Sequence, residues 1–199
     1  MSPALTLAIA AVGGYLLGSI PFGWIFGWLA GAGDVRKIGS GSTGATNVLR
    51  TGNYWAAGAT VICDALKGVV AVLLARHFGI EAAVVAGIGA FLGHLFPVWL
   101  KFHGGKGVAT AAGVLFAFSW PVTLLSLATW VVVALIFRIS SLAALVTAAA
   151  TPVYFAIFSE RLYALAAFVL AVLIFLSHRA NIARLLKGQE PRIGQKAKA

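Results

Sequence analysis

The sequence predicts an all-α integral membrane protein with about seven transmembrane helices. Of the 199 residues, 61% are hydrophobic and only 10% are charged, whereas a soluble domain carries about 25% charged residues. The apolar residues also form runs long enough to cross a bilayer, which takes about 20 residues in a helix. We expect a single transmembrane domain over residues 1–199, in which residues 178–199 are a cytoplasmic tail.

The first span is expected over residues 4–30, with Pro21 as a kink. Residues 1–33 contain no charged side chain, and the first cations, Arg36 and Lys37, follow the apolar stretch. A secretory signal peptide instead has positive charge before its apolar core. We therefore expect a retained span whose N-terminus lies outside.

The longest uncharged segment decides the number of spans. Residues 107–137 are too many for one ordinary helix, and "SWP" at 119–121 interrupts them. Two short helices forming a hairpin fit this segment best. A re-entrant pair is the alternative, and it would leave five spans with the same sidedness. The other spans are expected at residues 54–75, 82–100, 141–158 and 162–177.

Basic residues set the expected orientation. The chain has 15 Lys and Arg but only 5 Asp and Glu. Seven spans with the N-terminus outside would place twelve of these cations inside, as the positive-inside rule requires: Arg36, Lys37, Arg50, Lys101, Lys106, Arg138, Arg179, Arg184, Lys187, Arg192, Lys196 and Lys198. The excess therefore indicates topology and attraction to anionic lipids and solutes, and we expect no nucleic-acid partner.

Neither disulfide nor metal chemistry is indicated. Cys63 is the only cysteine, which excludes an intrachain disulfide framework and a cysteine zinc site. No cluster of ligands has a spacing suited to a metal. We expect no metal and no cofactor.

The stretch "GSGSTGATNVLR" at residues 39–50 fits the glycine spacing of a dinucleotide-binding turn, but its context does not. That turn must follow a strand and open a helix in a βαβ unit, whereas this one follows a membrane span. A phosphate-loop NTPase is excluded as well, because Ala45 follows Gly44 where Gly-Lys-Ser/Thr is needed.

The same stretch has the chemistry of an anion-binding loop. Glycines at 39, 41, 44 and 52 permit positive φ, so that successive N–H groups can converge on an anion. Arg50 can hold a phosphate through two parallel hydrogen bonds. The loop's short polar side chains are Ser40, Ser42, Thr43, Thr46 and Asn47. A flexible, solvated loop is the alternative.

A second loop on the same expected face has a similar composition. In "FHGGKGVAT", Gly104, Gly105 and Gly107 surround Lys106 just before a helix. A mobile cation beside free N–H donors at a helix start suits a phosphate. One such loop could be a tight turn whose lysine sets orientation. Two on one face indicate a phosphate-binding site.

Three ionisable residues are expected inside the bundle. Asp64 and Lys67 are i,i+3 within a span, where each costs about 2.5–3.5 kcal/mol to insert. We favour an ion pair that braces the loop over direct catalysis. His94 could be a general base, but a hydrogen-bonded packing histidine is favoured.

The start of the tail, "HRAN", leaves two interpretations open. His178 and Asn181 could close over the site from the last span. They could equally belong to an ordinary juxtamembrane segment.

Together these motifs resemble one family, the bacterial integral-membrane glycerol-3-phosphate acyltransferases that use acyl phosphate. "GSGSTGATNVLR", "DALKG" and "GHLFPVWLKFHGGKGVAT" occur in the family's order. The resemblance implies a seven-helix enzyme of the bacterial inner membrane with its active site on the cytoplasmic side. It would make 1-acylglycerol 3-phosphate and phosphate, the first step of phospholipid synthesis. A separate soluble phosphate acyltransferase would supply the acyl phosphate.

The residues themselves and the resemblance together give expected roles for individual residues; the resemblance implies those of Ser40, Gly41, Ser42, Asn47, Arg50, Lys106, His178 and Asn181. The expected catalytic residues are Lys106, Ser40 and Arg50. The expected substrate-binding residues are Gly41, Ser42, Thr46, Asn47, Gly104, Gly105, Gly107, Ser141, His178 and Asn181. Asp64, Lys67 and His94 are expected to support them.

Three positions depart from the family's pattern. The family usually has Asn where this chain has Ser42, and Lys is common where this chain has His103. A second Ser is often found where this chain has Ala144, so Ser141 is the nearer candidate for a substrate contact.

For the reaction, an acyl phosphate already has a good leaving group, so positioning dominates. No His has an Asp five residues later, so the H-x-x-x-x-D pair of many glycerolipid acyltransferases is absent. His94, His178 and Asp64 are candidate bases, but we favour proton transfer to the donor phosphate. The alternative function is a transporter of a phosphorylated solute, whose site would lie near the midplane between repeats.

Overall fold

The computed structural model describes residues 1–193, and within this range it contains helices but no strand. The chain divides into two compact units, residues 1–117 and residues from Phe118 onward. Whether they form the single domain expected from the sequence stays a prediction. Lys196 and Lys198, expected on the inside, lie outside the described residues.

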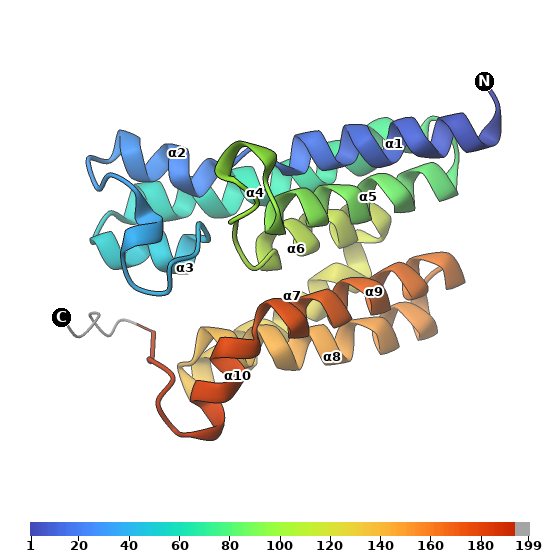
Figure 1. Cartoon of the computed structure of the whole chain (residues 1–199). Coiled ribbons are helices and arrows are strands. Elements are labelled where there is room, and N and C mark those ends of the chain that lie inside the picture. The colour runs from blue at the N-terminus through green and yellow to red at the C-terminus, as the bar shows by residue number, and fades with distance from the viewer. Residues whose placement is uncertain (194–199) are drawn as a thin grey trace. The chain divides into compact units, whose positions relative to one another are not determined.

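The first unit is a bundle of long helices with shorter ones at one end (Figure 1). Its elements are α1 (Pro3–Gly18), α2 (Phe22–Leu29), η1 (Val35–Lys37), α3 (Ala45–Val48), η2 (Leu49–Thr51), α4 (Tyr54–Arg76), α5 (Ile80–Leu95), η3 (Val98–Leu100) and most of α6 (Val108–Phe118). The first apolar stretch is broken before α2, at Pro21, as predicted, because proline lacks the N–H that would continue the helix.

Small residues let α1 and α5 pack closely. A Cβ at Gly14 would overlap the carbonyl of Ala86, and one at Gly93 would overlap the carbonyl of Tyr15. Helices in a bilayer associate through such close backbone contact, because lipid is as apolar as the side chains it would replace. The tight pairing of these helices holds the loop that follows α5 in place.

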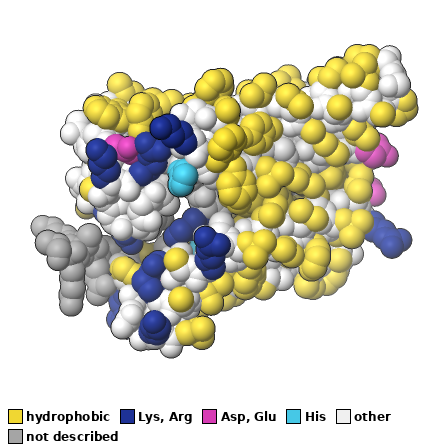
Figure 2. Space-filling model, in the orientation of Figure 1, with side chains coloured by type: hydrophobic (Ala, Val, Ile, Leu, Met, Phe, Trp, Pro, Cys, Tyr) yellow, Lys and Arg dark blue, Asp and Glu magenta, His cyan; other side chains and the backbone are white. Residues whose placement is uncertain are grey.

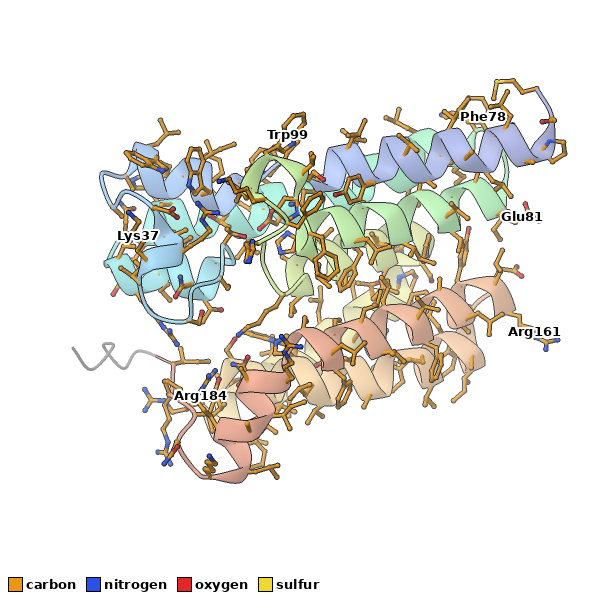
Figure 3. The ribbon with its side chains drawn as sticks, in the orientation of Figure 1. Lys37, Phe78, Glu81, Trp99, Arg161 and Arg184 are labelled. Carbon is orange, nitrogen blue, oxygen red and sulfur yellow. The ribbon has the colours of Figure 1, made fainter. Side chains whose placement is uncertain are left out.

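The two ends of the first unit differ in character. The N-terminus and the turn between α4 and α5 lie at one end, and α2 and α3 lie at the other. Phe78 and Glu81 mark the first end and Lys37 the second (Figure 3). On the face shown in Figure 2, the dark-blue cations of this unit gather at the second end, and yellow apolar side chains predominate over the middle of the unit.

In its described part, up to residue 193, the second unit contains four helices: α7 (Trp120–Phe137), α8 (Ser140–Phe158), α9 (Arg161–Ser177) and α10 (Arg179–Leu186). Helix α8 packs against both α7 and α9. The rings of Phe118 and Tyr163 stack with their centroids 4.5 Å apart. Helix α10 bends away from α9 by 63°, which turns the tail out of the line of the last long helix.

Within residues 1–193, five helical stretches are long and apolar enough to span a membrane, one of them made of α1 and α2 together. The number is six if α9 and α10 form one bent span. The chain is thus a multi-pass membrane protein. The seven-span count and the outside N-terminus are not confirmed and stay predictions. The predicted break near "SWP" is present, but the two helices that flank it are unequal, because α7 has 18 residues and α6 only 11. At 1.5 Å per residue, α6 covers roughly half of the hydrocarbon core.

Candidate functional site

Two glycine-rich loops meet at the cation-rich end of the first unit. The N–H of Thr43 donates to the carbonyl of Gly104 at 3.5 Å. The guanidinium of Arg36 donates to the carbonyl of Leu100 at 3.4 Å. The loop that carries Ser42 and the loop that carries Lys106 therefore lie side by side.

Asn47 holds the first loop in shape. Its amide nitrogen donates to the carbonyls of Val35 and Ser42, both at 2.8 Å, and of Ile38 at 3.2 Å. Its amide oxygen accepts from the N–H of Ser40 at 2.9 Å. Its amide thus holds the loop together, and the expected contact of Asn47 with substrate stays a prediction.

The main chain of the first loop is also largely occupied. The N–H groups of Gly41 and Gly44 donate to the carbonyl of Ile38 and to the hydroxyl of Ser42. Three of the four glycines have positive φ, but Gly44 does not. Several N–H groups of this loop therefore have acceptors within the protein, and a convergence of the others on an anion stays a prediction.

Arg50 is the clearest anion-binding group of the first loop. It is half-buried, and its guanidinium lies over Gly39, where a Cβ would come within 2.7 Å of Nη1. Gly39 has φ +55°, a conformation that disfavours any larger residue. Within residues 1–193, no hydrogen-bond or ion-pair partner of Arg50 is found. Its charge is not balanced by a neighbouring carboxylate.

Arg36 differs from Arg50 because it has an internal partner. Its guanidinium donates to both carboxylate oxygens of Asp34, the closest approach being 2.7 Å. The hydrogen bond from Arg36 holds the pKa of Asp34 below its ordinary value, although burial opposes this. Arg36 therefore braces the loop.

In the second loop the glycines serve close packing. The N–H groups of Gly104 and Gly105 donate to the carbonyls of Leu95 and His94, each at 3.1 Å. A Cβ at Gly105 would overlap Nε2 of His94. We expected free N–H donors here, but these two are occupied by the end of α5.

Lys106 follows directly and precedes α6, as predicted. It is half-buried. Gly107 has φ +82°, and a Cβ there would overlap the ring of Phe91. Of the other expected contacts, Ser40 and Thr46 are exposed and Ser42 is half-buried, so all three hydroxyls are on or near the surface of the loop.

A buried polar cluster supports both loops. Nζ of Lys67 lies 2.8 Å from Oδ1 of Asp64, which confirms the predicted pairing. The same ammonium donates to the carbonyl of Ile20 at 2.9 Å, a group left without a helical partner by the break at Pro21. His94 Nδ1 lies 3.5 Å from Asp64 Oδ1. The cluster thus connects α4 with the start of α2 and the end of α5.

The remaining expected site residues lie in the second unit. Ser141 is in the first turn of α8, and Asn181 is in the first turn of α10; both are buried. The buried ring of His178 lies at the bend, with Nδ1 2.9 Å from the carbonyl of Ile174. A carbonyl only accepts, so Nδ1 carries the proton in this bond.

A carboxylate that the sequence reasoning missed joins two of these residues. Ser141 Oγ donates to Glu190 Oε1 at 2.7 Å, and Asn181 Nδ2 donates to the same oxygen. The available signal was that Glu190 is the only acidic residue after Glu160 in a basic tail.

Comparisons with known proteins agree with this architecture. The family model described as glycerol-3-phosphate acyltransferase matches residues 8–188. A protein named glycerol-3-phosphate acyltransferase from Mesorhizobium japonicum is 57% identical to this chain over 190 residues, which cover 96% of this chain and 97% of the relative. The protein of the same name from Caulobacter vibrioides is 60% identical over 200 residues, which cover 98% of this chain and 91% of the relative.

Solved structures give the same result. The crystal structure of PlsY (YgiH), an integral membrane glycerol 3-phosphate acyltransferase, in its glycerol 3-phosphate form has a TM-score of 0.89 at 38% identity, covering 94% of this chain and 96% of that one. The crystal structure of its lysophosphatidic acid form has a TM-score of 0.87, and the match covers 94% of this chain and 95% of that one. On this evidence, the chain belongs to the glycerol-3-phosphate acyltransferase family of integral membrane proteins.

Proposed function

We propose that the protein transfers a fatty acyl group from acyl phosphate to the 1-hydroxyl of glycerol 3-phosphate. The products are 1-acylglycerol 3-phosphate and inorganic phosphate. Membership of the family supports glycerol 3-phosphate as acceptor, and the solved relatives in glycerol 3-phosphate and lysophosphatidic acid forms support this acceptor and product. The acyl phosphate donor is proposed from the motifs of the sequence.

The observation that carries the proposal is the unbalanced charge at the joined loops. Asp34 is paired with Arg36 and Asp64 with Lys67, so these carboxylates do not balance Arg50. A half-buried guanidinium without a carboxylate favours an anion from outside the chain, and its fork matches a phosphate. Lys106 lies on the neighbouring loop and would add a second cation.

In the proposed reaction, the oxygen of the glycerol 1-hydroxyl attacks the carbonyl carbon of the acyl phosphate. The new C–O bond forms as the bond to the phosphate oxygen breaks, and phosphate leaves. Negative charge grows on the carbonyl oxygen and on the departing phosphate. Lys106, Arg50 and the hydroxyl of Ser40 would stabilise it, and one such donor is worth about 2.7–4 kcal/mol.

The hydroxyl proton goes to the departing phosphate in this scheme. His94 is buried against Gly105 and faces Asp64, which supports a packing role. His94→Ala and His178→Ala should therefore lose far less than the roughly 10⁴-fold in kcat at unchanged KM that would identify a general base. A loss of that size in either variant would contradict proton transfer to the phosphate.

We also propose where the protein lies in the cell and how it is oriented in the membrane. We place the protein in a bacterial inner membrane with the joined loops on the cytoplasmic side. A separate soluble phosphate acyltransferase would supply the acyl phosphate from there. The cations gathered at the loop end of the first unit support this orientation through the positive-inside rule.

One assay tests the function. Detergent-purified protein is given acyl phosphate and glycerol 3-phosphate, and product is followed by mass spectrometry together with phosphate release. Parallel reactions contain acyl-CoA or the acyl thioester of acyl carrier protein as donor, and only acyl phosphate is expected to react. Uptake of glycerol 3-phosphate into vesicles without any acylated product would favour the transporter instead.

A further inference from the structure

The turn that follows α5 exposes apolar side chains. Residues 96–103, here called the aromatic turn, lie entirely in the first unit. Four of these eight residues are apolar and exposed: Phe96, Val98, Trp99 and Phe102. Trp99 is the most exposed of them, at 64%, and projects from the outer side of the turn (Figure 3). Exposed apolar side chains gathered on one short segment indicate a surface that another molecule covers.

The length of α5 indicates what covers it. Helix α5 has 16 residues, so it rises roughly 24 Å, whereas the hydrocarbon core of a bilayer is about 30 Å thick. Glu81 lies in the first turn of α5, and the next Asp, Glu, Lys or Arg in the chain is Lys101. The uncharged stretch 82–100 therefore completes its crossing through the aromatic turn, whose rings lie where the hydrocarbon core ends.

The main chain of the aromatic turn suits that depth. At the edge of the hydrocarbon, backbone polar groups need partners within the protein, because water competes poorly there. The hydroxyl of Tyr15 donates to the carbonyl of Phe96 at 2.7 Å. The N–H of Phe102 donates to the carbonyl of Pro97 at 3.0 Å. These bonds keep main-chain groups inside the turn while its rings point outward.

Two residues of the turn have a backbone conformation that side chains disfavour. Lys101 has φ +54° and Phe102 has φ +62°, in the left-handed region that glycine adopts most readily. The ring Nδ1 of His103 lies 2.6 Å from the carbonyl of Lys101 and fixes this conformation. The cost of holding a lysine and a phenylalanine in this way is offset if both side chains gain from contacts outside the chain.

The side chains have the composition of a membrane–water boundary. Tryptophan is enriched at this boundary, and a lysine can keep its stem in the apolar layer and its ammonium among the headgroups. Lys101 is exposed and has no ion-pair partner within residues 1–193. We propose that the aromatic turn is an interfacial anchor, in which Phe96, Trp99 and Phe102 lie between acyl chains and headgroups and Lys101 binds the phosphate of an anionic phospholipid.

A depth measurement tests the anchor. A nitroxide is attached at position 102 through Phe102→Cys in a Cys63→Ser background, and the full chain is reconstituted in nanodiscs of phosphatidylethanolamine and phosphatidylglycerol. Collisions with oxygen report lipid, and collisions with a water-soluble nickel complex report water. The controls are Leu66→Cys, exposed near the middle of α4, and Thr46→Cys, exposed on the first loop.

The label at position 102 should collide more often with oxygen than with the nickel complex, though by a smaller ratio than the label at position 66. The label at position 46 should show the reverse. Thermal unfolding in detergent shows whether each labelled variant folds. If Phe102→Cys does not fold, Trp99→Cys carries the label and the same result is expected.

The lipid preference tests the role of Lys101. A fluorophore at position 102 is quenched by lipids that carry a nitroxide on the headgroup, and anionic lipid is compared with zwitterionic lipid. Lys101→Gln should lower the preference for anionic lipid roughly fivefold, because a cation near the surface is worth about that factor. Arg161→Gln, an exposed cation of the second unit, should leave the preference unchanged.

Three outcomes would overturn the anchor. In one, the nickel complex reaches position 102 as readily as position 46, which would place the turn in water. In another, neither reagent reaches position 102, which would mean that a second copy of the chain or another protein covers the turn. The third is a lipid preference that Lys101→Gln does not alter. None of these measurements requires acyl transfer, so failure of the proposed function would leave the test intact.

Discussion

The polar end of the first unit leaves one cation without a counter-ion, whereas the hydrogen-bond cluster around Glu190 in the second unit pairs its cation with a carboxylate. At the joined loops, Asp34 and Asp64 are each paired with one cation, and Arg50 has no partner in the described part of the chain. In the second unit, the charge of Arg184 is balanced by Glu190. The first arrangement suits an anionic ligand, and the second suits orientation of neutral groups.

The comparison shows that counting cations is a poor guide to an anion site. Arg36 and Arg50 are fourteen positions apart on the same loop region, yet one is neutralised by Asp34 and the other is not. A carboxylate within hydrogen-bond distance converts a cation from a ligand-binding group into a brace.

The largest effect is expected from breaking the buried ion pair between Asp64 and Lys67 in the first unit. Asp64→Asn leaves the buried Lys67 ammonium without its counter-ion and should cost about 3–5 kcal/mol of folding free energy. Unfolding in detergent measures it. The double variant Asp64→Asn with Lys67→Met should regain much of the loss. Equal stability of Asp64→Asn and wild type would show that the pair is not a brace.

Removal of the unpaired charge of Arg50 should leave the fold intact and lower the activity. Arg50→Ala should lower kcat/KM about 10²–10³-fold, or about 2.7–4 kcal/mol, because a charged donor to phosphate is lost. Arg50→Lys should recover part of this, since the charge returns without the bidentate geometry. Arg161→Ala, an exposed cation at the opposite end of the second unit from Arg184 (Figure 3), is the control. A similar loss in this control would point to a general charge effect.

A change in the shape of the second loop should have an intermediate effect. Gly105→Ala forces a Cβ into the position of the His94 ring and should cost about 1–3 kcal/mol of stability. Gly13→Ala is the matched control, because nothing lies within 4 Å of its added Cβ. In the interior of α1 it should stabilise by about 0.5–1 kcal/mol. Thermal unfolding that ranks the two variants the other way would contradict this packing.

The smallest effect is expected from the partly exposed ion pair between Asp34 and Arg36. Because folding lowers the pKa of Asp34, its pairing with Arg36 stabilises the protein above the ordinary carboxyl value of 3.8 and is lost as pH falls through the lower folded-state pKa. Partial exposure limits the contribution to about 0.2–1 kcal/mol. Asp34→Asn should remove this part of the pH dependence of unfolding. An unchanged profile would mean that the pair contributes nothing.

Some of the site could be predicted because its partners are close in sequence. Asp64 and Lys67 share a helix face, and their burial follows from their position inside a span. The occupied N–H groups of Gly104 and Gly105 could not be predicted in this way, since they depend on how the loop folds back onto the end of α5. Glu190 was missed because it meets Ser141 across 49 positions of sequence.

The sequence alone determined that this chain is a helical membrane protein and that its helices are interrupted at Pro21 and near Ser119. Bilayer thickness and the missing N–H of proline act locally, so sequence suffices for them. Only the tertiary structure decided which polar groups stay available to a ligand. Hydrogen bonds form over roughly 3 Å, and such proximity arises from packing between helices that are far apart in the chain.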